Sequence, residues 1–356
     1  MKILQRVIIV ATVVVCLFEI GSAQGSGDNV KLAQTGMQFL SVVSDARAAA
    51  LGNSVTTLPM GSSSLFFNPA TMTESKFLEM STSINQWIAD IRHNTLSLSI
   101  NPANGDYGVF GISVQSVDYG EIIGTVVDNS RPQGFSDFSE IGLSNPNPNG
   151  LAIGLGYAKA LNTQFSVGGQ VRYVHQDLGA SIIATDTVRY IDTLATPRDT
   201  TVVINRNLVN NRKAPIVFDF GTTFKTGFKS LVLGMSVRNF ASEIKYADES
   251  FELPLTFNVG LSMDVMDFFE DRSFISSVFV STNAVHNRDY HEQIYVGTEI
   301  TVLKALALRG GYVSNSDENA LSFGFGVSLV GVTFDYAYTP YGIFDKVQRF
   351  TLRYSI

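Results

Sequence analysis

Residues 320–340 read ALSFGFGVSLVGVTFDYAYTP, and every second side chain in this stretch is apolar. The first apolar series begins at Leu321 and the second at Val332, with Gly331 between them, and the intervening positions carry Gly, Ser, Thr, Ala and one Asp. Because successive side chains of a strand point to opposite faces, each half has one apolar face and one small, polar face. A soluble sandwich would bury that apolar face in a protein core, whereas a transmembrane barrel would turn it towards lipid.

The composition favours the membrane alternative. Charged residues make up 16 % of the 356 residues, against roughly 25 % in ordinary soluble domains. Phenylalanine (25), tyrosine (13) and glycine (30) are abundant. The acidic balance, with a formal net charge of −7, gives no reason to expect nucleic-acid binding, which needs a basic face.

Residues 1–23 have the pattern of a secretory signal peptide. Lys2 and Arg6 precede an apolar run over 7–18, and the small residues 21–23 form a cleavage site before Gln24. That run is too short for the roughly 20 residues of a membrane-spanning helix, and no later stretch approaches that length. The sequence therefore predicts export, and the mature chain is either soluble or a barrel.

Few residues suggest a catalytic or metal-binding site. Cleavage would remove the only cysteine, Cys16, and would leave 23 basic and 31 acidic residues. The four histidines are too few and too scattered for a metal site, and we find neither a nucleophile elbow nor a paired acid/base constellation. We expect no enzyme activity, no cofactor and no metal.

Alternating segments continue from residue 77 to the last residue, and their number is even. We predict strands over 77–85, 93–101, 107–117, 150–160, 164–176, 215–225, 230–240, 253–264, 273–285, 291–302, 304–314, 319–330, 331–339 and 347–356. Together they predict an all-β fold, a transmembrane antiparallel barrel of about 14 strands over 76–356.

The lengths of the connections support a barrel. Bacterial outer-membrane barrels have short periplasmic turns and longer outer loops. The connections after even-numbered strands are short: 102–106, 161–163, 226–229, 265–272, 303 and 330–331. Those after odd-numbered strands include the two longest, 118–149 and 177–214, beside 86–92, 241–252, 286–290, 315–318 and 340–346. A sandwich has no reason to sort its loops in this way, so the apolar faces are expected to meet outer-membrane lipid.

Charged residues occur at positions that this register places in the lumen. They are Arg172, Asp219, Arg238, Asp264, Glu299, Arg309, Asp335 and Arg349. Opposite charges inside a narrow lumen would pair with one another, so we interpret them as an internal salt-bridge network rather than a conduction filter.

Residues 24–75 do not alternate and are expected to form an N-terminal hatch or plug inside the lumen. Ser44 can cap an alanine-rich helical turn that Gly52 ends. The apolar residues around Phe39 and Leu65 need burial, which disfavours a disordered periplasmic tail.

The sequence resembles the PorV/PorQ outer-membrane proteins, relatives of the FadL fatty-acid channels. The matching residues are Phe39-Leu40, Asp45-Ala46-Arg47-Ala48, Leu51-Gly52, Asn68-Pro69-Ala70, Leu308-Arg309-Gly310-Gly311-Tyr312, Asp335-Tyr336-Ala337-Tyr338 and Pro340-Tyr341-Gly342. The resemblance implies a barrel with an N-terminal hatch, in which Asp45 and Arg47 form a charge pair or hydrogen-bonding group that docks the hatch against the wall. Asn68 and Pro69 would make a rigid turn that leads into the first strand.

The resemblance also implies a function. A PorV-like component of type IX secretion would lie in the outer membrane and receive exported proteins through their C-terminal signal domains, with those proteins and translocon subunits as partners. Two alternatives remain: a FadL-like transporter that passes hydrophobic compounds through the lumen, and a structural barrel without a transport role. A continuous apolar tunnel would favour transport, whereas a sealed interior with exposed apolar outer loops would favour partner binding.

Overall fold

A computed structural model describes most of the chain after residue 34. The described residues are 35–128, 131–192, 199–246, 249–270, 273–289, 291–316, 320–344 and 346–356. The predicted signal peptide, 1–23, and residues 24–34 of the predicted hatch lie outside them. Within the described ranges, no helix is both long enough and apolar enough to cross a membrane.

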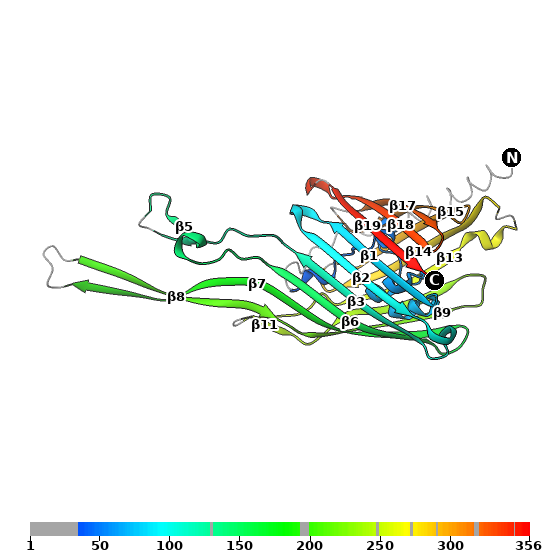
Figure 1. Ribbon diagram of the computed structural model, residues 1–356, viewed down its shortest axis with the longest axis horizontal. Coiled ribbons are helices and arrows are strands. Elements are labelled where there is room, and N and C mark those ends of the chain that lie inside the picture. The colour runs from blue at the N-terminus through cyan, green and yellow to red at the C-terminus, as the bar shows by residue number, and fades with distance from the viewer. Residues whose placement is uncertain are drawn as a thin grey trace.

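Fourteen antiparallel strands form a closed barrel, which confirms the predicted fold (Figure 1). In chain order they are β1 (Leu78–Gln86), β2 (Arg92–Ile100), β3 (Val109–Asp118), β6 (Asn149–Ala160), β7 (Phe165–Asp192), β9 (Ile216–Lys225), β10 (Val232–Phe240), β13 (Thr256–Asp264), β14 (Ile275–Asn287), β15 (Gln293–Val302), β16 (Leu306–Val313), β17 (Leu321–Leu329), β18 (Val332–Pro340) and β19 (Lys346–Ser355). Each strand pairs with the next one along the chain, and β1 pairs with β19 to close the ring. Closure leaves no unpaired sheet edge in the barrel wall, as hydrocarbon requires.

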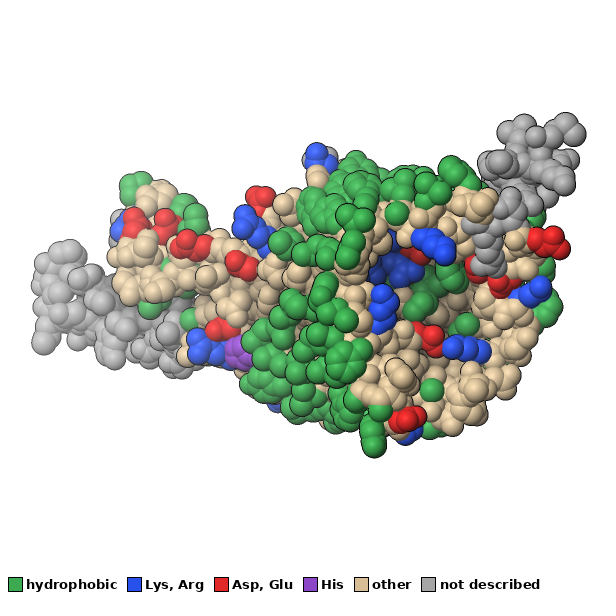
Figure 2. Space-filling model, turned by 45° about the vertical axis from the view of Figure 1, so that its right-hand side comes forward, with side chains coloured by type: hydrophobic (Ala, Val, Ile, Leu, Met, Phe, Trp, Pro, Cys, Tyr) green, Lys and Arg blue, Asp and Glu red, His purple; other side chains and the backbone are tan. Residues whose placement is uncertain are grey.

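The alternation of side chains along each strand separates an outer apolar face from an inner polar one. On β17, Phe323 is 52 % exposed whereas its neighbour Ser322 is 4 % exposed. Large apolar side chains are likewise exposed along the other barrel strands, and they cover broad areas of the wall in Figure 2. These outward faces match the hydrocarbon layer of a bilayer, and the small inward side chains leave room inside the ring.

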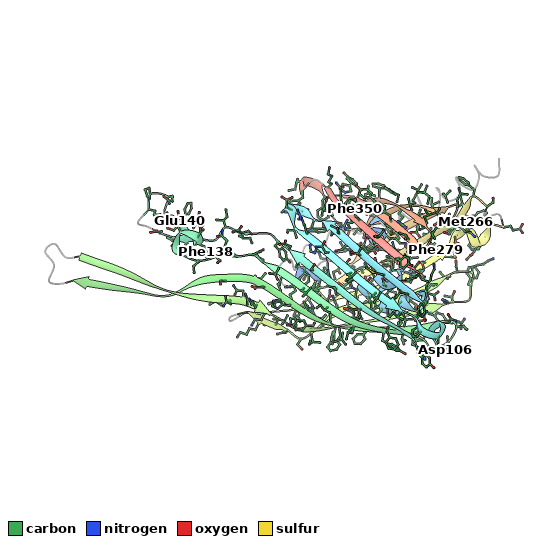
Figure 3. The ribbon with its side chains drawn as sticks, in the orientation of Figure 1. Asp106, Phe138, Glu140, Met266, Phe279 and Phe350 are labelled. Atoms are coloured by element: carbon green, nitrogen blue, oxygen red, sulfur yellow. The ribbon has the colours of Figure 1, made fainter. Side chains whose placement is uncertain are left out.

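The two ends of the barrel differ as the sequence predicts. One end carries the long connections, which extend to the left in Figure 1, and the other carries short turns. Phe138 and Glu140 lie far out in a long connection, whereas Asp106 lies in a turn at the opposite end (Figure 3). The tightest turn joins β17 to β18 through Val330 and Gly331, whose φ angles of 48° and 80° fit a two-residue hairpin turn.

The prediction of a loop over 177–214 is wrong, because most of this region is a β-hairpin that projects from the barrel. β7 continues to Asp192 and pairs with β8 (Asp199–Lys213), beyond the last pairing of β7 with β6 at Asp177. Both arms are rich in β-branched residues, which suit an extended ribbon. Pro215 separates β8 from β9, since proline has no N–H to give to a ladder.

The long connection 119–148 has structure of its own. It contains β4 (Thr125–Val127), β5 (Phe135–Asp137) and the 3₁₀ helix η6 (Phe138–Ile141). Arg131 donates a hydrogen bond to Glu140, 2.8 Å away, and this bond lowers the pKa of the Glu140 carboxyl. The shorter connection between β10 and β13 contains the hairpin β11 (Ile244–Tyr246) and β12 (Glu249–Phe251).

The N-terminal segment, residues 35–77, is a chain of short helices: η1 (Gln38–Leu40), α2 (Ala46–Ala50), η2 (Gly61–Phe66) and η3 (Pro69–Glu74). Asp45 caps α2 by accepting a hydrogen bond from Ala48 N, so the predicted capping role of Ser44 is wrong. A carboxylate can accept the same capping hydrogen bond as a hydroxyl, and its negative charge is also stabilised by the positive N-terminal end of the helix dipole. Gly52 follows with φ of 58° and ends the turn.

The hydrophobic core lies between the N-terminal segment and the inner wall. Phe39 and Leu40 pack with Val117 and Val174, and Leu65 packs with Val109. Around the ring, α2 contacts β16 to β19, η2 contacts β1 to β3, and η3 contacts β6, β7 and β9. The segment is therefore enclosed by the wall along most of its length.

The close approach of the segment to the wall gives a direct test at β16. A Cβ placed on Gly311 would overlap the backbone of Leu51 and Gly52, whereas one placed on Gly310 would meet nothing within 4 Å. Gly311→Ala is therefore expected to lower the free energy of unfolding by about 1–3 kcal/mol through overpacking and to expose the segment to protease.

Gly310→Ala is the matched control, since it adds the same methyl group on the opposite face of the same strand. We expect it to change the free energy of unfolding by less than about 0.5 kcal/mol. Denaturant titration and limited proteolysis of the two variants measure the difference. Equal behaviour would show that the segment does not press on this strand in solution.

Candidate functional site

A chain of buried ion pairs inside the barrel joins residues of β15, β16, β18 and β19 across five neighbouring strands. Glu299 of β15 and Arg309 of β16 are cross-strand partners, with 2.5 Å between Arg309 Nε and Glu299 Oε2. Arg309 Nη1 also donates to Asp335 Oδ1 of β18 at 2.6 Å. The second oxygen of Asp335 accepts from Arg353 of β19, whose Nε lies 3.1 Å away.

The N-terminal segment joins this chain through Arg47. Its guanidinium binds both oxygens of Glu299, with Nε at 2.8 Å and Nη2 at 2.7 Å, and Nη1 donates to Pro59 O. We call Arg47, Glu299, Arg309, Asp335 and Arg353 the ionic chain. A bidentate ion pair such as Arg47–Glu299 holds both side chains in a fixed geometry, so it attaches α2 to the wall.

Glycine makes room for the ionic chain. Gly326 of β17 is the cross-strand partner of Asp335. A Cβ at Gly326 would lie 2.8 Å from the terminal nitrogens of Arg309 and would overlap Asp335 Oδ1. The small residue is required because the Arg309 guanidinium and the Asp335 carboxylate already fill the space above it.

A second buried charge group lies across the barrel. Arg172 of β7 pairs with Asp219 of β9, with Nε 2.7 Å from Oδ2, and its Nη2 also reaches Asn239 Oδ1 of β10 at 2.5 Å. Asp219 further accepts from the backbone N–H of Asn239 at 2.7 Å. The acceptor positions of the carboxylate are thus well satisfied, as a buried charge requires.

Two arginines of the wall hold carbonyl groups of the N-terminal segment. Arg349 Nε donates to Val43 O at 2.8 Å and its guanidinium lies 5.4 Å from the centre of the Trp87 ring. Arg238 Nη2 lies 3.4 Å from Leu40 O and stacks over the ring of Phe67. These contacts fix the stretch between η1 and α2.

The residues predicted to dock the hatch take separate positions. Arg47 pairs with Glu299 rather than with Asp45, which bonds to its own helix. Asn68 caps η3 through Ala70 N and donates to Thr56 O and Thr222 O, and Pro69 occupies the first position of that helix. Whether these contacts dock a hatch remains a prediction.

The predicted lumen charges are buried except for Arg238, which is half-buried, and most of them take part in the contacts above. Asp264 differs from the others, since it caps the 3₁₀ helix η7 (Val265–Phe268) at the end of β13. Arg353 was not among the predicted lumen charges. It lies between Leu352 and Tyr354, on the same face of the strand as Arg349, so the alternation of this strand could have identified it.

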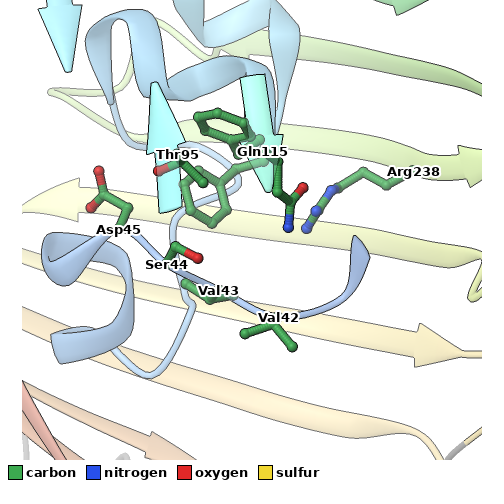
Figure 4. Close-up of a pocket in the computed structure, with 9 residues that line it drawn as sticks. Val42, Val43, Ser44, Asp45, Thr95, Gln115 and Arg238 are labelled. Atoms are coloured by element: carbon green, nitrogen blue, oxygen red, sulfur yellow. The ribbon is translucent and has the colours of Figure 1, made fainter. Parts of the chain in front are cut away.

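Two cavities lie beside the N-terminal segment, one lined by apolar and polar side chains and the other mainly polar. The first, of about 10 Å³, lies between the N-terminal segment and the wall, where Gln115 and Arg238 face one another (Figure 4). The second, of about 180 Å³, lies at the short-turn end and is lined mainly by charged and hydroxyl side chains. Neither is a long apolar passage. Among the described residues, no group of three or more His, Cys, Asp or Glu side chains is placed to hold a metal ion.

The sequence profile of the type IX secretion system membrane protein family PorP/SprF matches residues 144–342, more than half of the chain. The chain belongs to this family. The expected link to type IX secretion is confirmed at this level, but the matching family is PorP/SprF, and the assignment to PorV/PorQ remains a prediction. The barrel and the family together make this PorP/SprF protein an outer-membrane protein.

Solved structures with the same fold are FadL-like barrels. The toluene transporter TbuX of Ralstonia pickettii has a TM-score of 0.56 at 12 % identity, with 87 % of this chain and 98 % of that one covered. A FadL homologue of Pseudomonas aeruginosa has a TM-score of 0.53 at 12 % identity, with 88 % and 98 % covered. The CymD monoaromatic hydrocarbon channel has a TM-score of 0.53 at 14 % identity, with 88 % and 97 % covered.

At these identities the likeness establishes the fold of the PorP/SprF protein and nothing about its ligands. No curated protein matches the sequence.

Proposed function

We propose that this outer-membrane component of type IX secretion binds exported proteins at the end that carries its long connections, through their C-terminal signal domains. The N-terminal segment acts as a hatch that keeps the lumen shut while the barrel anchors the binding surface. The chain reaches the outer membrane after cleavage of residues 1–23.

The charged interior is the observation that carries this proposal. The ionic chain, the Arg172–Asp219 pair and the N-terminal segment lie inside the barrel, and the cavity at the short-turn end is lined mainly by charged and hydroxyl side chains. A path for hydrophobic solutes would need an apolar lining, whereas these side chains would have to break charge-assisted hydrogen bonds to let such a solute pass.

The long connections offer surface for a partner. In the loop 119–148, Ile122, Ile123, Val127 and Phe135 are exposed large hydrophobic residues. The hairpin of β7 and β8 beyond Asp177 pairs only within itself, so the backbone of both arms has a free edge in the described residues. Exposed apolar side chains and free strand edges are common features of protein-binding surfaces.

Shortening the hairpin tests this proposal in cells. Gly179 and Asn211 face one another across it, and Asn211 Nδ2 donates to Gly179 O at 3.2 Å. Residues 180–210 can therefore be replaced by a two-residue Asn-Gly turn without disturbing the barrel pairing. In a strain that lacks the native gene, we expect the shortened protein to assemble in the outer membrane but to restore less than about a tenth of the secretion that the full-length protein restores.

Transport of hydrophobic compounds is the alternative, since the structural neighbours CymD and TbuX are a monoaromatic hydrocarbon channel and a toluene transporter. Uptake of a labelled monoaromatic hydrocarbon by the same strains separates the two functions. Unchanged secretion in the strain that lacks the gene, together with lost uptake, would contradict the secretion role and support transport.

A further inference from the structure

We propose that the cavity at the short-turn end of the barrel is a binding site for an oxyanion, that is, for a carboxylate or phosphate group. The cavity opens among the ends of β15 to β19, where Lys304 lies in the turn between β15 and β16. In the view of Figure 2 this end of the molecule comes forward and is hollowed, with Lys and Arg side chains in the hollow.

Cations outnumber carboxylates on the lining of the cavity. Arg47, Arg309, Arg353 and Lys304 supply four positive charges, and Glu299 is the carboxylate among the lining residues. Asp335 lies behind the cavity, bonded to Arg309 and Arg353, and Asp45 and Glu79 also interact electrostatically with Arg353. The cations that face the cavity favour an anionic group there.

Lys304 is the side chain most available to that anion. Its backbone N–H donates to Ser276 Oγ at 2.9 Å, which fixes the turn. In the part of the chain that the structure describes, its ammonium group has no hydrogen-bond or ion-pair partner, although Lys304 lines the same cavity as Glu299. Three N–H donors are therefore open to a ligand.

Hydroxyl groups complete the lining. Thr333 and Ser328 share a hydrogen bond of 2.8 Å, in which one hydroxyl donates and the other keeps its proton for a further acceptor. Thr301 lies on the same lining. Together with the cations, these groups offer donors to several oxygens of one anionic group, as carboxylate and phosphate sites do.

The size of the cavity suits a small group. Its volume of about 180 Å³ corresponds to roughly six water molecules. One phosphate ion, or the carboxylate end of a peptide, fits that space. The short turns of outer-membrane barrels face the periplasm, so the ligand would arrive from that side.

The test uses the whole mature protein in a nonionic detergent and inorganic phosphate as the probe. Binding of phosphate is measured from the width of its ³¹P NMR line, and added chloride keeps the ionic strength constant. We expect saturable binding to the native protein and at least about tenfold weaker binding to Lys304→Glu. Lys229→Glu is the matched control: Lys229 also lies in a short turn at this end, with φ of 53° against 58° for Lys304, but outside the cavity. Thr333→Val is a second variant that weakens binding without changing the charge.

A short glutamate peptide then distinguishes the sources of the oxyanion. Displacement of phosphate by the peptide assigns the site to a carboxylate of a protein partner, and no displacement assigns it to a free anion. Absence of saturable phosphate binding to the native protein, or equal weakening in the two lysine variants, would overturn the proposal. Because the measurement uses purified protein, its outcome is independent of the secretion assay.

Discussion

Replacement of Asp335 by Asn lowers the free energy of unfolding by about 3–5 kcal/mol, because it leaves two buried guanidinium groups without their shared counter-charge. The Asp335 side chain is fully buried and accepts from Arg309 at 2.6 Å and from Arg353. Asparagine has nearly the same shape but no charge, and its amide would point donors at donors. Arg309 also bonds to Glu299, which holds Arg47. The substitution is therefore expected to weaken the Glu299–Arg47 pair as well and to release the N-terminal segment.

Trp87 provides the measurement, since it is the only tryptophan and lies against Tyr341, with 5.0 Å between ring centroids. Urea titration of its fluorescence reports the loss of the barrel. Asp106→Asn is the control, because Asp106 is exposed in a short turn and its change is expected to stay within about 0.5 kcal/mol. Equal midpoints for the two variants would mean that the ionic chain does not contribute to stability.

Replacement of Phe325 by Lys is expected to destabilise the barrel by about 2–4 kcal/mol in lipid vesicles, since it places a charge on the lipid-facing side near the middle of β17. Phe325 is 40 % exposed and its ring lies 5.6 Å from that of Tyr336. If this face met water, the same change would remove an exposed aromatic side chain and cost little. The sign and size of the effect therefore report which solvent covers the face.

Val330→Lys is the matched substitution for this second experiment. Val330 is 92 % exposed in the turn that ends β17, so its lysine would reach the water interface. We expect a change of about 0–1 kcal/mol there. Equal destabilisation at both positions would contradict burial of the β17 face in hydrocarbon.

The sequence determined the class of fold because alternation has a direct physical meaning. Each strand of the barrel wall has period two, so its apolar face and its polar face could be read residue by residue, as at Phe323 and Ser322. The sorting of long and short connections then distinguished a barrel from a sandwich. The same pattern indicated which charges face inward, including Glu299 and Arg309.

The hairpin of β7 and β8 was missed because its alternation lies in a segment whose length indicated a loop. The backbone pairing from Asp177 to Asp192 became visible only in the structure.

Only the tertiary structure decided which charges pair. Arg47 and Glu299 are 252 positions apart, and the family resemblance implied only that Asp45 and Arg47, as a charge pair or hydrogen-bonding group, dock the hatch against the wall. Pairing depends on the strand register and on how α2 lies against the wall, and both are set by contacts such as that of Gly52 with Gly311. The cationic lining of the short-turn cavity depends on the same long-range packing. Local sequence fixes the side of the wall to which a residue points, whereas the partner that it meets depends on the whole ring.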